Sequence, residues 1–146
     1  MLFRSDASIL YSKLPEVREK WHRIADGLRE RFDMFDDWGM FAYTNGAFKP
    51  WGDYLAEIDI GIWEMKWDEE TWAAWVDAKR EIARVSIEHG GSISACHGAC
   101  RAGEVDLVPT EMGGGFEVMK TIKRSLDPNN IMNPSKYLLG QAYEEE

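Results

Sequence analysis

The segment DEETWAAWVDAKREIARVSIEHGG, residues 68–91, carries the clearest folding signals of the chain. Its apolar residues recur at three- and four-residue steps, which predicts an amphipathic helix. Asp68 stands where a side chain can cap the first turn, and acidic residues follow where the helix dipole favours them. Gly90 can adopt the left-handed conformation that ends a helix, and His89 in the last turn is assigned a structural role.

The segments before this helix predict two strands and a further helix. In LAEIDIGIWEM, residues 55–65, isoleucines alternate with polar residues or glycine, which is the period of a half-buried strand. A second strand is expected at residues 40–43, ahead of the turn signal TNG. The segment LPEVREKWHRIADGLRERF, residues 14–32, has the apolar spacing of an amphipathic helix, with His22 on its solvated side.

The segments after residue 91 predict a short strand, a loop and a third helix. EVDLVPTEMGGG, residues 104–115, is expected to be a loop, and GFEVMKTIKRSLD, residues 115–127, repeats the helical spacing. The proline- and asparagine-rich residues 127–139 are expected to form a compact irregular segment. The order of elements predicts an α+β fold, an antiparallel sheet with helices packed mainly on one face.

Size and charge limit the possible partners. The 146 residues predict a single domain. The net charge of −9 argues against nucleic acid, because a phosphate backbone needs a basic footprint. No apolar run approaches the ~20 residues of a membrane span, and no export signal is evident, so a cytoplasmic location is expected. The seven tryptophans are expected mainly in the core, with a part of them covering an interface.

His97 lies between the only two cysteines of the chain, in GGSISACHGACR, residues 90–101. A metal site is disfavoured because adjacent Cys96 and His97 do not easily bind one ion, and no second cysteine and histidine cluster completes four ligands. A redox pair of Cys96 and Cys100 is disfavoured because the C-x₃-C spacing is not the C-x-x-C spacing that lowers a thiol pKa. No metal is therefore expected here.

A third interpretation is a glycine-rich turn that presents His97 to a ligand. Gly98 would let the backbone approach that ligand closely, and Arg101 would hold an anionic or polar group. A nearby cation lowers the pKa of an imidazole and keeps it neutral near pH 7, so His97 would be able to act as a general base.

Two motifs together resemble a known family. EHGGSISACHGACR, a short spacer, a helix and then LDPNNIMNPSKYLL are similar to the C-terminal end of the FAD-linked oxidases. This is the family of vanillyl-alcohol oxidase and p-cresol methylhydroxylase, and it includes D-lactate and glycolate dehydrogenases and alkylglycerone-phosphate synthase. Its usual pattern is GG-[ST]-IS-x-x-HG followed by LDP-x-x-[IL]-[NA]-PGK. The resemblance covers roughly residues 88–139.

The resemblance implies roles for individual residues. His97 takes the position of the family histidine that lies over the flavin beside the substrate, where it acts as base or hydrogen-bond partner while hydride passes to flavin N5. Arg101 stands where several branches carry a basic residue. Gly98, Asn133 and Lys136 are expected near the cofactor, the last two because the family's N-P-G-K segment packs against the flavin domain.

The resemblance also implies how the chain is organised. Residues 1–146 are expected to be one substrate (cap) domain, the ferredoxin-like half of a flavin-oxidase cap, with residues 127–146 packing toward a flavin domain on another chain. Nothing in the sequence resembles the family's FAD-binding domain. The chain is therefore expected to be the small subunit of a heteromeric FAD-dependent oxidoreductase that acts on a hydroxylated or phenolic small molecule. The FAD would be bound mainly by a partner subunit, and residues 38–51 would help to form the joint.

Three positions depart from the family pattern. Cys96 stands where metal-dependent 2-hydroxyacid members carry glutamate, and Cys100 and Ser135 replace glycines. These substitutions fit a site retuned to another substrate. They equally fit a site that has lost its activity, and the alternative function is then a non-catalytic assembly or regulatory subunit beside an active flavoprotein partner.

Overall fold

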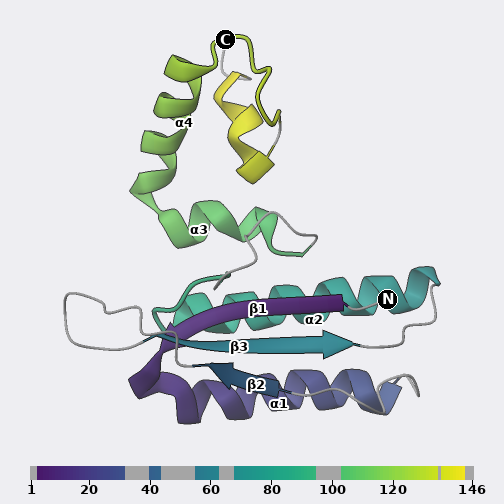
Figure 1. Ribbon diagram of the computed structural model, residues 1–146. Helices are drawn as coiled ribbons and strands as arrows, with labels where there is room; N and C mark the ends of the chain where they lie inside the picture. Colours follow the sequence, from purple (N-terminus) through teal and green to yellow (C-terminus); the bar gives the residue numbers. More distant parts are fainter. Residues whose placement is uncertain are drawn as a thin grey trace.

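The computed structural model describes residues 3–31, 40–43, 55–62, 68–94, 103–134 and 136–143 (Figure 1). Three strands, four α-helices and three short 3-10 helices lie within these ranges. The aromatic segment that was expected to form a joint with a partner, residues 38–51, lies outside the described residues except for its strand at 40–43.

The strands form one antiparallel sheet in the order β1-β3-β2. β1 is Phe3–Leu10, β2 is Met40–Tyr43 and β3 is Leu55–Ile62. β1 and β3 pair along their whole length, with Phe3 opposite Ile62. β2 and β3 occupy the two segments predicted as strands, whereas β1 was not predicted. In β1, Ala7 and Ile9 are buried and alternate with the polar residues Asp6 and Ser8, but this alternation extends over only four residues.

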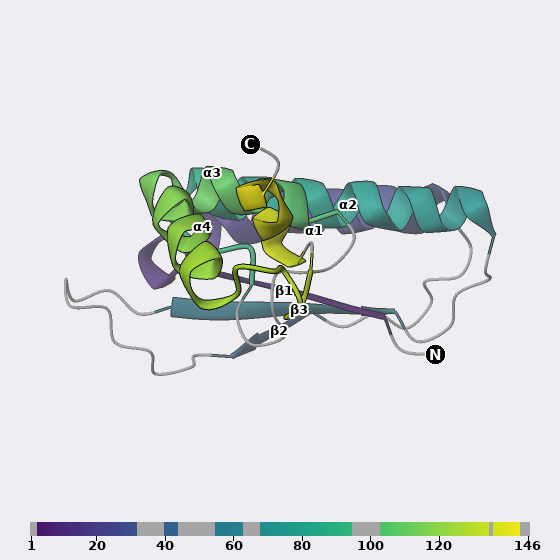
Figure 2. The same cartoon turned by 90° about the horizontal axis from the view of Figure 1, so that it is seen from above.

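Two long helices cover one face of this sheet (Figure 2). α1 is Leu14–Arg31, preceded by the 3-10 helix η1, Tyr11–Lys13, and α2 is Glu69–Glu88. Their apolar spacing has the predicted consequence: Trp21 of α1 and Trp75 of α2 are buried. Asp68 caps α2 as expected, since its Oδ1 accepts a hydrogen bond from Thr71 N at 2.8 Å.

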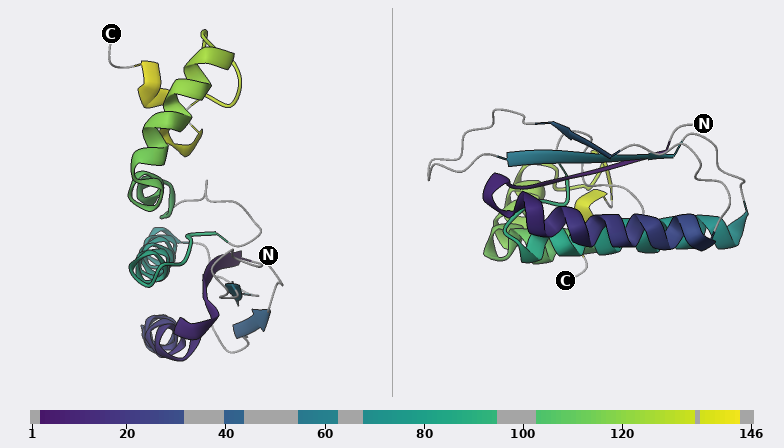
Figure 3. Two further views of the ribbon diagram at one scale, coloured as in Figure 1. Left: turned by 90° about the vertical axis from the view of Figure 1, so that its left-hand side faces the viewer. Right: turned by 90° about the horizontal axis from the view of Figure 1, so that it is seen from below.

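The C-terminal third forms a helical unit on the side of α2 away from α1 (Figure 3). It consists of η2 (Val105–Leu107), α3 (Val108–Met112), α4 (Gly114–Leu126) and η3 (Lys136–Tyr143). A second core joins it to α2, and its buried members are Ala83, Ile93, Val108 and Phe116. The predicted loop over residues 104–115 is therefore wrong in part. Pro109 falls at the first positions of α3, where a missing backbone N–H costs nothing.

The predicted fold class is wrong for the chain as a whole. An α+β fold with helices packed mainly on one face of an antiparallel sheet, as the ferredoxin-like half of a cap domain, was expected. The structure is instead mostly helical, and its strands are at most eight residues long. The physical reason is that Phe116 of α4 is buried in a cluster with Ala83 of α2 and Val108 of α3, and this cluster contains no strand residue, so the third long helix starts a separate layer. Among the residues after α2 that the structure describes, only Ser92 adds to the strands, through one isolated bridge to Ser8.

The apolar residues of α4 are only partly buried. Phe116 is 5% exposed, whereas Val118, Ile122 and Leu126, which follow one another at four-residue steps on another side of the helix, are 59%, 53% and 73% exposed. The spacing predicted the helix correctly, while most of its apolar stripe faces outward. Ile131 and Met132 extend this surface on the turn that follows. We call the five exposed residues the α4 apolar stripe: Val118, Ile122, Leu126, Ile131 and Met132.

Candidate functional site

The segment GGSIS is fastened to the first strand. Ser8 and Ser92 exchange backbone hydrogen bonds, with N–O distances of 3.0 and 2.7 Å. Gly91 N also donates to Ser86 O of α2 at 2.8 Å. A Cβ at Gly91 would lie 2.1 Å from Ser8 O, so only glycine allows this close approach of the two backbones. The chain that leaves α2 is therefore held in place at Gly91 and Ser92.

The backbone contacts α2 again at Gly103 and Glu104, the first described residues after the segment 95–102. Gly103 has a φ of +88°, and a Cβ there would lie 2.5 Å from Val76 O of α2. Glu104 is buried and its Oε1 lies 3.1 Å from the Nζ of Lys79, a residue of α2 that is also buried. A second ion pair, between Arg80 and Asp106, joins the same two elements at the surface. The described residues on either side of the segment 95–102 are thus anchored: Gly91 and Ser92 to α2 and β1, and Gly103 and Glu104 to α2.

The sequence-predicted residues His97, Gly98 and Arg101 lie in the segment 95–102, outside the described residues. The same is true of Cys96 and Cys100. Their expected roles stay predictions. Asn133 and Lys136 lie in the C-terminal unit, where the structure describes them.

The Lys123–Asp127 pair organises the turn that follows α4. The carboxylate of Asp127 accepts hydrogen bonds from Ile131 N and Met132 N, both at 2.8 Å, and forms an ion pair with Lys123. Lys123 also donates to Met132 O. Tyr143 closes the arrangement from η3, since its hydroxyl donates to Asp127 O. The turn is therefore held by charge-assisted hydrogen bonds, which are stronger than neutral ones.

The environment of Asp127 shifts its titration. The hydrogen bond from Lys123 lowers the pKa of the Asp127 carboxyl, and the backbone N–H groups of Ile131 and Met132 lower it further, against an opposing effect of desolvation. The side chain is only 4% exposed. Asp127 is thus held as a carboxylate, and the turn keeps its anchor at neutral pH.

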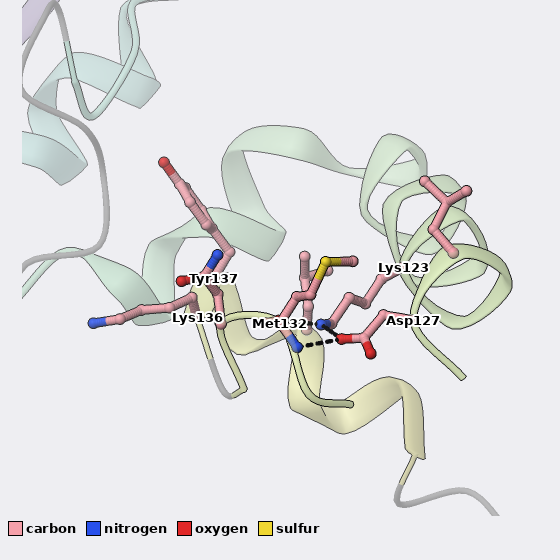
Figure 4. A pocket seen from close by; sticks show the side chains of 8 residues that line it. Lys123, Asp127, Met132, Lys136 and Tyr137 are labelled. Atoms are coloured by element: carbon pink, nitrogen blue, oxygen red, sulfur yellow. Dashed lines mark hydrogen bonds and ion pairs between the residues drawn. The ribbon is translucent and has the colours of Figure 1, made fainter. Parts of the chain in front are cut away.

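A pocket of about 550 Å³ lies between this turn, the end of α4 and η3 (Figure 4). Its apolar wall is formed by Leu126, Met132, Tyr137 and Leu139. Its polar wall is formed by Lys123, Asp127, Asn133 and Lys136. The Lys136 ammonium points away from the Lys123–Asp127 pair, as Figure 4 shows, and this side chain is exposed. The pocket therefore offers one outward cation and one amide beside an apolar surface.

The backbone around the pocket is unusual. Asn130 and Asn133 have positive φ values, 49° and 48°, which asparagine tolerates. Tyr137 and Leu138 also have positive φ values, 55° and 60°, and such bulky residues rarely adopt this conformation. Strained backbone of this kind concentrates at ligand and active sites. Both residues pack against the core around Phe116, which supports their conformation.

The family motif in the sequence marks two of the eight residues that line the pocket, Asn133 and Lys136. It missed Lys123, Asp127 and Tyr137. The i,i+4 spacing of Lys123 and Asp127 at the end of a predicted helix was a usable signal, because residues at this spacing can pair. No local pattern marked Tyr137.

Two further properties concern only the described ranges. Nowhere in them do three or more histidine, cysteine, aspartate or glutamate side chains gather in a way that could hold a metal ion. Every helix found there is too short or too polar to cross a bilayer.

Comparison with protein families gives one match. A family model described as FAD linked oxidases, C-terminal domain, matches residues 62–137, just over half of the chain. The matched region begins at the end of β3 and includes α2, the segment 95–102, α4 and the turn with Asn133 and Lys136. A search of curated protein sequences found no match.

Proposed function

Since the chain belongs to the family of the FAD-linked oxidase C-terminal domain, we propose that it forms the substrate side of the active site of an FAD-dependent oxidoreductase. The substrate is a small hydroxylated or phenolic molecule, and the FAD is bound mainly by a partner chain. The observation that carries the proposal is the extent of the match, which includes both the His97 segment and the Asn133–Lys136 turn.

The described residues fit a flavin group. The pocket combines an apolar wall with the Asn133 amide and the Lys136 ammonium. An aromatic ring system with carbonyl groups and an anionic phosphate chain needs apolar contact together with donors of this kind. Asn133 and Lys136 would hold the edge of the cofactor nearest this chain.

The proposed chemistry is the removal of a hydride and a proton from the substrate. The chemistry that bound FAD supplies is the acceptance of the hydride with its two electrons. His97 takes the proton from the substrate hydroxyl as the C–H bond breaks, and the product is a carbonyl compound or the corresponding quinone methide. Arg101 orients the anionic or polar end of the substrate.

The exposed apolar residues support a partner domain on this side. The α4 apolar stripe borders the pocket through Leu126 and Met132. Clustered apolar side chains at the surface mark interaction sites. A flavin domain that covers the stripe would also cover Asn133 and Lys136, and so exclude water from the pocket.

The test is replacement of His97 in the assembled oxidoreductase. The chain is purified together with its FAD-binding partner, and flavin reduction is followed by absorbance with D-lactate, glycolate and vanillyl alcohol as probes. His97→Ala is expected to reduce the rate by about 10²–10⁴-fold with unchanged flavin content, because a positioned base contributes about that factor. His22→Ala, on α1, is the matched control. Equal rates for His97→Ala and the unmodified complex would contradict the catalytic role.

The same preparation separates the alternative of a non-catalytic subunit. If the partner chain alone reduces its flavin with these probes as fast as the complex does, the present chain contributes no chemistry.

A further inference from the structure

We infer that His89 exchanges hydrogen-bond partners between Lys20 and Glu16 when its imidazole takes up a proton, and so joins α1 to α2 in both protonation states. His89 directly follows α2 as its C-cap, and its side chain is only 12% exposed. Glu16 and Lys20 lie one turn apart on α1. The inference goes beyond the proposed function and does not depend on it.

The contact with Val85 determines which ring nitrogen of His89 always carries a proton. The Nδ1 atom lies 2.6 Å from the backbone oxygen of Val85, one turn earlier on α2. A carbonyl oxygen can only accept a hydrogen bond, so Nδ1 is protonated and donates. Nε2 is therefore an acceptor in the neutral ring and a donor in the charged ring.

α1 offers Nε2 a suitable partner for each of these states. The Nζ of Lys20 lies 2.8 Å from Nε2. An ammonium can only donate, so this hydrogen bond requires the neutral ring. The Oε1 of Glu16 lies 3.1 Å from Nε2. A carboxylate can only accept, so a hydrogen bond at this position requires the charged ring. One ring therefore cannot make both hydrogen bonds at once.

The exchange of partners requires the movement of one side chain. Lys20 and Glu16 already form an ion pair, with Nζ and Oε1 3.1 Å apart. Protonation of His89 places a second positive charge beside the Lys20 ammonium, and the repulsion drives Lys20 away from Nε2. Lys20 is partly exposed, so it can move into solvent. Glu16 already lies within hydrogen-bond distance of the new donor.

Glu16 is ionised in both states of the ring. The hydrogen bond from Lys20, and after it the one from His89, lower the pKa of the Glu16 carboxyl against an opposing effect of desolvation. Carboxyl groups with a lowered pKa are ionised throughout the pH range in which histidines ordinarily titrate. The acceptor is therefore present when the ring becomes a donor.

The other described groups around the ring leave this exchange intact. On α2, the carboxylate of Glu88 is already paired with Arg84. On η1, Lys13 is exposed. β1 faces this turn with the apolar side chain of Leu10. Within the described part of the chain, only Lys20 and Glu16 offer the ring a charged hydrogen-bond partner.

The first experiment is an NMR titration of the unmodified full chain. The nitrogen resonances of its three imidazoles are recorded from about pH 5 to about pH 8, and His89→Leu assigns the ring. At the upper limit, His89 is expected to carry its proton on Nδ1 and none on Nε2. A neutral ring with its proton on Nε2, or a ring that does not titrate between these limits, would overturn the inference.

The second experiment measures the coupling of His89 to each partner by double-mutant cycles. His89→Leu is combined with Lys20→Met or with Glu16→Met, and unfolding in urea is followed at both limits of pH. At about pH 8, the coupling to Lys20 is expected to change the unfolding equilibrium constant by about two- to fivefold, as partly exposed charged pairs do. At about pH 5 this coupling should disappear and the coupling to Glu16 should increase.

Arg23→Met is the matched control, because Arg23 lies on the same helix with a side chain that is 80% exposed. It is expected to show no coupling to His89 at either pH. A coupling to Lys20 that is the same at both values, or a coupling to Glu16 that does not increase in acid, would overturn the inference. If a variant does not fold, the titration of the unmodified chain still decides. Neither experiment needs FAD or substrate, so a failure of the proposed function remains a separate result.

Discussion

Ser8 and Ser92 exchange both of their backbone hydrogen bonds, and this bridge joins the first strand to the segment that leads to His97. The two residues are 84 positions apart in the sequence. The strand that the sequence analysis missed is thus the one that fixes the start of the family motif. The second glycine of GGSIS has a direct use in this chain: Gly91 allows the two backbones to meet.

Gly91→Ala is expected to lower the free energy of unfolding by about 1–3 kcal/mol, which is the usual cost of forcing extra volume into a packed site. The added Cβ would meet Ser8 O at 2.1 Å, so the bridge to Ser92 has to open. Urea unfolding followed by tryptophan fluorescence measures the change. Gly27→Ala is the control, since no atom lies within 4 Å of its Cβ position and alanine in a helix gains about 0.5–1 kcal/mol. Equal stability of the two variants would contradict this reading of the bridge.

Asp127→Asn is expected to destabilise the chain at pH 7 and to have a smaller effect in acid. The pKa of Asp127 is lowered in the folded chain, so its contribution to stability is complete above its unfolded pKa of about 3.9. That contribution is lost as the pH falls through the lowered value of the folded state. The difference in Tm between Asp127→Asn and the unmodified chain should therefore become smaller as the pH is lowered below about 4. Asp26→Asn, on the exposed side of α1, is the control. A difference in Tm between Asp127→Asn and the unmodified chain that does not change with pH would contradict the lowered pKa of Asp127.

Leu126→Glu and Ile131→Glu are expected to leave the isolated chain intact, because these side chains are 73% and 75% exposed. Changes at exposed positions usually alter stability by about 0.5 kcal/mol or less. If the α4 apolar stripe is covered by the FAD-binding partner, each glutamate substitution should lower the affinity for that partner about tenfold or more. The reason is that a buried interface residue can contribute more than ~1 kcal/mol to binding. Affinity measured by titration of the partner gives the result. Tyr11→Glu, at an exposed residue of η1, is the control, and unchanged affinity for both stripe variants would exclude this surface.

Lys136→Met is expected to reduce the affinity of the assembled protein for FAD by about tenfold or more, because a hydrogen bond to a charged group contributes ~1.5–3 kcal/mol. Lys136→Arg retains the charge and should preserve most of the affinity. Lys13→Met, at an exposed lysine of η1, is the control. Flavin fluorescence during dilution measures the release. A Lys136→Met complex that keeps its FAD as well as the control does would remove Lys136 from the cofactor site.

The sequence predicted the helices of this fold better than its layers. The periodicity of α1, α2 and α4 marks them clearly, and the cap at Asp68 is confirmed by its hydrogen bond. The same periodicity does not say what an apolar face packs against. Phe116 is buried in a cluster with Ala83 of α2, and Leu126 is 73% exposed, so α4 does not pack on the sheet and the predicted fold class is wrong.

The candidate site was predictable only where a motif marks it. Asn133 and Lys136 came from the family pattern, and the pocket contains both. The buried Lys79–Glu104 pair escaped notice because a lysine inside an amphipathic helix resembles any solvated lysine. Its partner is 25 residues away, and only tertiary packing brings the two charges together.

α2 contributes buried residues to two hydrophobic cores. The sheet core lies on one side of it and the core around Phe116 on the other, so neither has a complete enclosure without this helix. The two cores are expected to unfold together, because unfolding of either core exposes apolar residues of α2, which also borders the other core. Damage far from the pocket, for instance in the contact of α1 with α2, would therefore also destabilise the residues that line the pocket.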